Sequence, residues 1–133
     1  MATNLEGLDK GLIKKTAHFI YDVPKDGGAA TTYTLGDKEV PPYAVVTSTK
    51  IYVETAFVGG TSVSFGLLTA ADISAAIATA TLVLNYAVVG TEVDATGTTW
   101  LLTGATGRQL ICVVVGTFTA GRVHVWADYF TIK

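Results

Sequence analysis

Charge is scarce in this chain of 133 residues, and its scarcity restricts the partners that the protein can have. Only 15% of the residues are Asp, Glu, Lys or Arg, whereas about a quarter is typical of globular domains. The nine Lys and Arg residues are scattered, and the formal net charge is −2. Because nucleic-acid-binding surfaces need clustered positive charge, we expect no nucleic-acid partner.

Cysteine is almost absent, and long apolar runs are missing. Cys112 is the only cysteine, so no disulfide can form within the chain, and its apolar surroundings in residues 110–115 predict a buried, unreactive thiol. No apolar run approaches the roughly 18 residues of a membrane span, and residues 1–6 lack the pattern of a signal peptide. We therefore expect no membrane partner and synthesis in a reducing cytoplasm.

Residues that carry chemistry are few and far apart. His18 and His124 would be neighbours if the first and last strands pair, which makes a two-histidine metal site conceivable. A solvent-facing or hydrogen-bonded histidine is the simpler interpretation of each. Ser64 lies in a strand-like stretch, not in a Gly-x-Ser-x-Gly turn. Glu92 and Asp94 are too few for a calcium site and predict a solvated turn. We expect no enzyme, no cofactor and no metal site.

Hydrophobic residues are abundant, at 50% of the chain, and they alternate with polar ones. In residues 16–23, Ala17, Phe19, Tyr21 and Val23 share one side, which is the period of a half-buried strand. The same criteria predict further strands at residues 30–35, 43–58, 62–68, 81–89, 98–103, 109–118 and 122–132. In the last of these, residues 123, 125, 127 and 129 alternate with residues 124, 126, 128 and 130.

The connections between the predicted strands suggest a fold class. Residues 36–42 are predicted as a loop, and residues 69–78 as a short helix capped by Thr69 or Asp72. We expect residues 43–68 to form a hairpin-like pair, and residues 119–121 to be the loop of a second hairpin. About eight short strands with one short helix predict an all-β protein, an antiparallel β-sandwich that is jelly-roll-like.

The first fifteen residues differ from the rest of the chain. Leu5, Leu8 and Leu12 are spaced to share one face of a helical turn, although Gly7 and Gly11 each cost an isolated helix about 1 kcal/mol. We expect an N-terminal arm over residues 1–15 and a β-sandwich domain over residues 16–133. The arm would order against the body or a neighbouring molecule; a frayed terminus is the alternative. Its candidate interaction residues are Leu5, Leu8, Leu12, Ile13, Lys14 and Lys15.

Large aromatic residues leave a carbohydrate-binding function open. Jelly-roll sandwiches include lectins, and exposed aromatic rings on a sheet face would stack against sugars. Aromatic residues are also the ordinary filling of such cores. The residues concerned are Trp100, Trp126, Tyr33, Tyr43, Tyr52, Tyr86 and Tyr129.

The succession of turns and strands resembles a known group of proteins. It consists of Tyr-Asp-Val-Pro-Lys-Asp-Gly-Gly at residues 21–28, then residues 33–36, 40–46 and 53–57, and the closing stretch 118–129. This pattern is similar to that of small structural proteins of tailed bacteriophages. Residues 69–106 follow it poorly, and residues 1–15 lie outside it.

The resemblance implies a virion protein without catalytic residues. It implies a trimeric decoration or auxiliary protein on the outer capsid surface, bound to the major capsid protein. A tail or fibre-associated adhesion component would show the same pattern.

Overall fold

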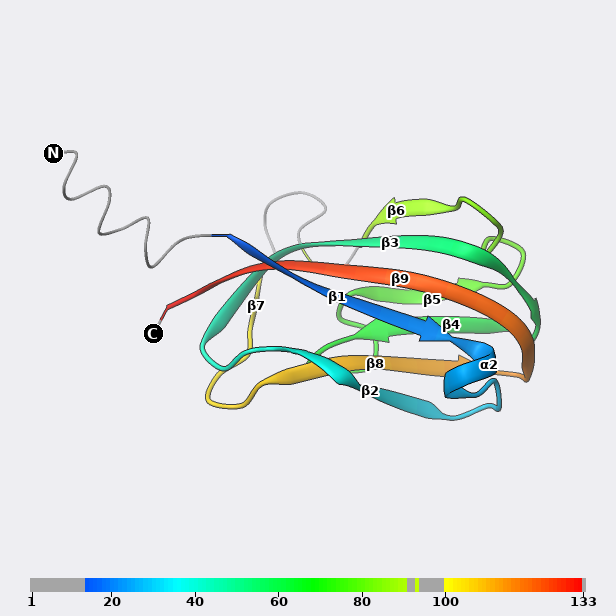
Figure 1. Cartoon of the computed structure of the whole chain (residues 1–133), viewed down its shortest axis with the longest axis horizontal. Helices are drawn as coiled ribbons and strands as arrows, with labels where there is room; N and C mark the ends of the chain where they lie inside the picture. Colours follow the sequence, from blue (N-terminus) through cyan, green and yellow to red (C-terminus); the bar gives the residue numbers. More distant parts are fainter. Residues whose placement is uncertain (1–13, 91–92, 94–99, 133) are drawn as a thin grey trace, which may run out of the picture.

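The protein is a sandwich of two antiparallel sheets (Figure 1). The computed structural model describes residues 14–90, 93 and 100–132. Sheet A has the strand order β1-β9-β3-β6, with β7 also paired to β3, and sheet B has the order β2-β8-β4-β5. The predicted all-β antiparallel sandwich is therefore confirmed. The elements are β1 (Lys15–Asp22), α2 (Val23–Asp26), β2 (Thr32–Val40), β3 (Ala44–Gly59), β4 (Ser62–Gly66), β5 (Ser74–Ala78), β6 (Ala87–Val89), β7 (Leu101–Leu102), β8 (Arg108–Val115) and β9 (Phe118–Thr131).

The strand pairing is that of a jelly roll. With the two-residue strand β7 set aside, the first strand pairs with the last, β2 with β8, β3 with β6 and β4 with β5. This is the pattern of one long hairpin rolled into two layers. Most consecutive strands therefore lie in opposite sheets, and only β4 and β5 form a local hairpin among those four pairs.

The core lies between the sheets and is built from the inward residues of each strand. On β1 and β9 the predicted alternation is confirmed, since Phe19, Tyr21, Val123 and Val125 are all buried. Sheet B contributes Phe65 and other apolar residues to the same cluster. Removing this apolar surface from water is the main force that holds the two layers together.

Both predicted hairpins are wrong. Strand β3 belongs to sheet A and β4 to sheet B, so residues 43–68 cross between the layers instead of pairing. Residues 119–121 lie inside β9, and the turn after β8 is at Gly116. A Cβ on Gly116 would lie only 2.8 Å from Cα of Gly60, so the two crossings pack backbone to backbone. The glycines that suggested hairpin turns instead allow the chain to change sheets.

The predicted helix at residues 69–78 is also wrong. Residues 74–78 form β5, and Asp72 does not cap a helix. Its carboxylate accepts hydrogen bonds from the backbone N–H groups of Leu67, Leu68 and Thr69, at 2.7, 2.9 and 2.9 Å. An Asp side chain that bonds to nearby backbone favours a turn over a helix, and this turn joins β4 to β5. The short helix is α2, which begins at Val23 with Pro24 in its first turn.

Two boundaries differ from the prediction. Strand β2 runs on to Val40 through an irregularity after Leu35, so most of the predicted loop at residues 36–42 is strand. The predicted strand at residues 81–89 shrinks to β6, because the chain turns at residues 84–85. Asn85 there has a φ of 67°, a conformation that Asn tolerates better than most residues.

Candidate functional site

A cluster of hydrogen-bonded side chains lies on the outer face of sheet A. His18 Nε2 is 2.8 Å from His124 Nδ1, and His124 Nε2 is 2.6 Å from Glu54 Oε1. Trp126 lies beside both imidazole rings. We call His18, Glu54, His124 and Trp126 the histidine cluster. It links three neighbouring strands through their side chains.

Strand alternation and register explain the position of the histidine cluster. His18 and His124 occupy the polar positions of β1 and β9, so their side chains point away from the core. The register places His18 opposite Trp126, and His124 opposite Tyr52 of β3. Diagonal neighbours on one sheet face lie within reach of long side chains. The condition that the first and last strands pair is therefore met, and the hydrogen-bonded interpretation of the two histidines is confirmed.

The two imidazole rings lie nearly in one plane. Their centroids are 5.0 Å apart and their planes differ by 16°, which with the 2.8 Å nitrogen contact places them edge to edge. Trp126 is parallel to His18 and His124 within 8° and 13°, at centroid distances of 4.8 and 5.5 Å. His18 Nε2 and His124 Nδ1 thus point at each other. This arrangement suits a shared proton better than a metal ion, whose ligand lone pairs must converge on a point.

Metal-binding geometry is also missing elsewhere in the part of the chain that the structure describes. No group of three or more His, Cys, Asp or Glu side chains is arranged there to hold an ion. Within the same residues, no helix is both long and apolar enough to cross a bilayer.

The charges around the histidine cluster alter its proton affinities. Burial, the neighbouring His124 and the charge of Lys38 lower the pKa of His18 below its ordinary value of 6.5. The hydrogen bond with His124 lowers the pKa of Glu54, assisted by Arg122, whose Nε lies 3.5 Å from Glu54 Oε1. At neutral pH the cluster therefore contains an uncharged His18 and an ionised Glu54.

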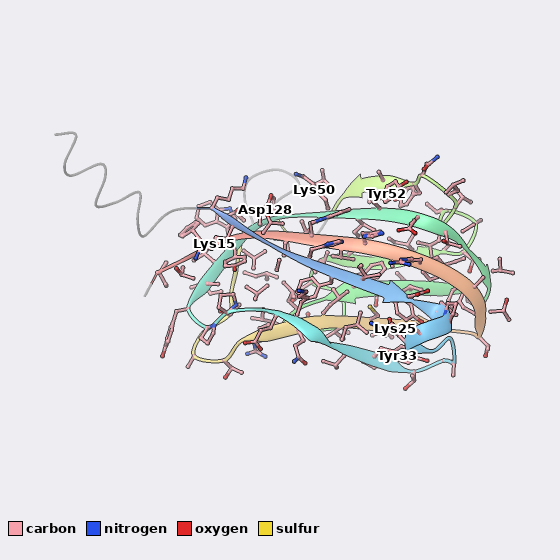
Figure 2. The ribbon with its side chains drawn as sticks, viewed as in Figure 1. Lys15, Lys25, Tyr33, Lys50, Tyr52 and Asp128 are labelled. Carbon is pink, nitrogen blue, oxygen red and sulfur yellow. The ribbon has the colours of Figure 1, made fainter. Side chains whose placement is uncertain are left out.

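A second group of hydrogen-bonded polar side chains connects the beginning of β1 to β9 and β3. The Asp128 carboxylate accepts hydrogen bonds from the hydroxyls of Thr16 and Ser48, at 2.7 and 2.9 Å. The ammonium groups of Lys14 and Lys50 are 3.7 and 4.0 Å from it. Burial alone would raise the pKa of Asp128, but these hydrogen bonds and charges outweigh burial and lower it. In Figure 2, Asp128 and Lys50 lie along β9 and β3, toward the end where β1 begins.

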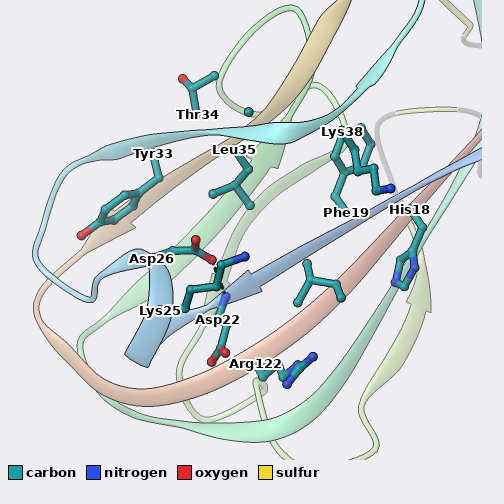
Figure 3. Close-up of a pocket in the computed structure, with 12 residues that line it drawn as sticks. His18, Phe19, Asp22, Lys25, Asp26, Tyr33, Thr34, Leu35, Lys38 and Arg122 are labelled. Atoms are coloured by element: carbon teal, nitrogen blue, oxygen red, sulfur yellow. Dashed lines mark hydrogen bonds between the residues drawn. The ribbon is translucent and has the colours of Figure 1, made fainter.

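A pocket of about 320 Å³ opens between β1 and β2, the free edge strands of the two sheets (Figure 3). Phe19 and Leu35 supply apolar surface, and Lys38 and Arg122 supply positive charge. The Asp26 carboxylate accepts the Asp22 backbone N–H at 2.9 Å. The pocket therefore mixes charges of both signs over an apolar floor, without an aligned nucleophile and base. Its lining comprises His18, Phe19, Ile20, Asp22, Lys25, Asp26, Tyr33, Thr34, Leu35, Gly36, Lys38 and Arg122.

The other residues considered from the sequence have structural roles or lie outside the described residues. Cys112 is fully buried, and burial raises the pKa of its thiol far above the ordinary value. The Ser64 hydroxyl donates to the carbonyl of Ala70 at 3.0 Å. Glu92 and Asp94 lie outside the described residues, as do Leu5, Leu8, Leu12 and Ile13 of the arm. Lys14 and Lys15 are exposed at the beginning of β1.

Apolar side chains gather where β7, β3 and β9 meet, close to the beginning of β1. Trp100, Leu102 and Ile132 are 52%, 57% and 54% exposed, and the Trp100 ring meets the Phe130 ring edge-on at 6.3 Å between centroids. Leu102 and Phe130 flank the same residue of β3 from its two sides. We call Trp100, Leu102, Phe130 and Ile132 the end patch. Exposed apolar side chains that cluster in this way are typical of interaction sites.

The aromatic residues do not form one platform for a sugar. Tyr33, Tyr86 and Tyr129 pack against the core, Trp126 packs beside the histidines, and Trp100 lies in the end patch. Figure 2 shows Tyr33 and Tyr52 far apart on the molecule. Tyr52 and Trp126 both lie next to His124 on the outer face of sheet A, and the carbohydrate-binding alternative stays a prediction.

The outer face of sheet B differs from that of sheet A. At most paired positions the described outward side chains are uncharged: Thr32, Thr34, Ser62, Ser64, Ala78, Ile111 and Val113. The charged residues Glu39 and Arg108 lie with Thr34 and Ile111 around a pocket at one end of this sheet. Sheet A carries Lys50, Glu54, Arg122 and Asp128 on its outer face. Uncharged, weakly polar sheet faces can be covered by a partner at a lower desolvation cost than charged ones.

Two solved bacteriophage capsids contain chains of similar structure. A chain in the capsid asymmetric unit of cyanophage Pam1 has a TM-score of 0.64 and 16% identity, covering 91% of this chain and 86% of that chain. A chain in the acid-stable capsid of Helicobacter pylori bacteriophage KHP30 has a TM-score of 0.60 and 14% identity, covering 90% and 89%. At these identities the likeness shows a shared fold. No family model and no curated protein matches the sequence.

Proposed function

We propose that this protein is a non-enzymatic structural component of a bacteriophage virion that decorates or cements the outer surface of the head. The observation that carries the proposal is the fold likeness to chains of two phage capsids over about nine-tenths of the chain. The jelly-roll fold alone would be weak support, because unrelated functions share it. The resemblance of the sequence to phage structural proteins supports the same proposal.

The contacts that such a protein needs have candidate surfaces. We assign attachment to the major capsid protein to the end patch together with the arm, residues 1–15, because β1 begins at Lys15, which pairs with Tyr129 next to that patch. We assign self-association to the uncharged outer face of sheet B. In a closed homotrimer this face of each subunit would contact a different surface of its neighbour, and the same contact would occur three times. The division of the chain into an arm and a body, residues 16–133, belongs to this proposal.

The polar groups support a structural role more than a catalytic one. His18, His124 and Glu54 bond to one another, and Asp128 bonds to Thr16 and Ser48. Catalysis requires a nucleophile or base aligned toward open space for a substrate. In the described residues these groups instead connect strands β1, β9 and β3.

The composition of purified virions tests the proposal. Heads and tails of the phage that encodes this chain are separated and quantified by mass spectrometry. We expect the protein in heads, at a fixed ratio to the major capsid protein, and we expect washed heads to retain it. Its absence from heads, or its confinement to tails, would overturn the decorating role and favour the tail-associated alternative.

Removal of the arm tests the attachment surface separately. A variant without residues 1–13 retains the whole of β1, so its fold can be checked by circular dichroism. We expect the dissociation constant for undecorated heads to rise at least about tenfold, a loss of about 1.4 kcal/mol or more in binding free energy. Undiminished occupancy would contradict the role of the arm.

A further inference from the structure

The histidine cluster lies where proton binding can act on the attachment of one strand. β1 is an edge strand that pairs only with β9 within sheet A. Two side-chain hydrogen bonds, Thr16 with Asp128 and His18 with His124, add to its backbone ladder with β9. The same strand carries the arm at its N-terminal end. Any change in the His18–His124 contact therefore affects how firmly β1 is held.

The number of protons on the two imidazole rings decides whether the His18–His124 hydrogen bond can form. An ionised Glu54 can only accept, so His124 Nε2 carries the hydrogen of that bond. The His18–His124 bond then needs one hydrogen between its two facing nitrogens. It exists when both rings are neutral, with His18 Nε2 donating, and it also exists when one ring has gained a proton. With both rings protonated, two N–H groups would face each other at 2.8 Å, and the bond cannot form.

We infer that the histidine cluster is a proton-sensitive contact, which holds β1 to β9 when the pair carries no added proton or one, and releases β1 when it carries two. This regulation goes beyond the proposed function and does not depend on it. Two imidazolium rings in contact repel each other, as any like charges do at such distances. Separation of the rings removes a side-chain hydrogen bond that holds β1, whereas β9 stays held on its other side by β3.

Charges of both signs surround the histidine pair. The Glu54 carboxylate is hydrogen-bonded to His124 and is shared with Arg122. Lys38 of β2 lowers the pKa of His18. The other charged or titratable groups near the pair are Lys50 and Tyr52 of β3, Asp22 of β1, Lys25 and Asp26 of α2, and Asp128 of β9, which lies 4.0 Å from Lys50. Because these charges are of both signs, the second proton is opposed chiefly by the positive charge of the first.

Hydrogen exchange on the isolated protein tests the inference. Protection factors, corrected for intrinsic exchange rates, are compared at pH 7.5 and pH 5.0 for peptides covering β1 and β3. We expect the protection of β1 to fall about tenfold relative to β3 at pH 5.0, because local opening of this edge strand then no longer breaks the His18–His124 bond. Unchanged relative protection of β1 would overturn the inference. Because no phage particle is involved, this result is distinguishable from a failure of the proposed function.

The matched variant is His18→Gln, whose amide can donate to His124 but cannot take up a proton. We expect its β1 protection to be the same at both pH values, with β3 protection at pH 7.5 equal to wild type. An equal loss at pH 5.0 in this variant would show that another group is responsible and overturn the inference. His124→Gln provides the same comparison if the first variant is unstable.

Nitrogen-15 NMR of the imidazole rings counts the protons directly. We expect two separate titration steps for the pair, as interacting sites show, and loss of the His18–His124 contact at the second. Two rings that titrate independently at ordinary values would contradict the inference, whatever the exchange data show.

Discussion

The outer faces of the two sheets differ in charge and in hydrogen bonding. On sheet A, charged and polar side chains from three strands bond to one another, as in the His18–His124–Glu54 chain and around Asp128. On sheet B, the paired strands present threonine, serine, alanine, isoleucine and valine to the outside. The polar side chains of sheet A are therefore stabilised by hydrogen bonds and ion pairs with one another. Sheet B loses few hydrogen bonds with water when a partner covers it.

This difference favours the outer face of sheet B for the self-association that we propose. Covering the charged part of sheet A, away from the end patch, would desolvate several charges, which costs more than their mutual contacts return unless the partner replaces every hydrogen bond. Covering sheet B removes water mainly from apolar and hydroxyl groups. The comparison predicts which face tolerates a new charge and which does not.

The largest effect is expected from a charge placed on sheet B. Val113→Lys introduces an ammonium group at the centre of the proposed subunit interface, and we expect the dissociation constant of the trimer to rise about 100-fold or more, because burying an unpaired charge costs several kcal/mol. Sedimentation velocity at micromolar concentration measures it. The control is Ala87→Lys on the exposed outer face of sheet A, which should leave association unchanged. A wild-type monomer, or equal effects of the two lysines, would refute the assignment of this face.

The end patch is expected to give the next largest effect. Trp100→Ala combined with Leu102→Ser should lower the number of copies bound per head about tenfold, because two half-exposed apolar side chains would be lost from the contact. The matched control is Val83→Ser with Leu84→Ser, at residues 50% and 59% exposed in another part of the surface. Both double variants should melt within a few degrees of wild type, because exposed substitutions change stability little. Equal binding by the two variants would contradict the assignment.

The fold was predictable from the sequence where the information is local. Alternation in residues 16–23 and 123–129 identified the inward faces of β1 and β9, because period-2 patterning records which side of a strand meets the core. The pairing of strands is not local information. The Gly59–Gly60 turn suggested a hairpin, yet it carries the chain to the other sheet. Only the packing of complete layers decides between these outcomes.

The candidate site was also predictable only where it did not depend on the pairing of interior strands. The sequence raised His18 and His124 as neighbours on the condition that the end strands pair, and that condition is met. Glu54 was missed as their partner because β3 was expected to pair with β4, whereas it pairs with β9. Asp128 was missed as a hydrogen-bonding centre for the same reason. The signal for it in the sequence was its polar position in the last strand, which the pairing of the two end strands places opposite Thr16.

A moderate effect on stability is expected from Asp128. Asp128→Asn removes the charge from a nearly buried group that accepts two hydroxyl hydrogen bonds, and we expect a loss of about 2 kcal/mol in the free energy of unfolding at pH 7. Because the pKa of Asp128 is lowered in the folded protein from its ordinary value of 3.8, its stabilising contribution is complete above that value. The contribution is lost as the pH falls below about 4 through the folded pKa. Urea unfolding between pH 7 and 2.5 should therefore show the two proteins converging in acid; a constant difference would contradict this origin.

The smallest effect is expected from Glu54→Gln, and it sharpens the contrast between the faces. The glutamine carbonyl can accept the same hydrogen from His124 Nε2, while the exposed ion pair with Arg122 is lost. Exposed ion pairs contribute little to stability, so the melting temperature at pH 7.5 should stay within about 2 °C of wild type. Association and head binding should not change, because the proposed contacts lie on sheet B and at the end patch. A loss of association in this variant would mean that the polar network of sheet A takes part in an interface, and the distinction between the two faces would then fail.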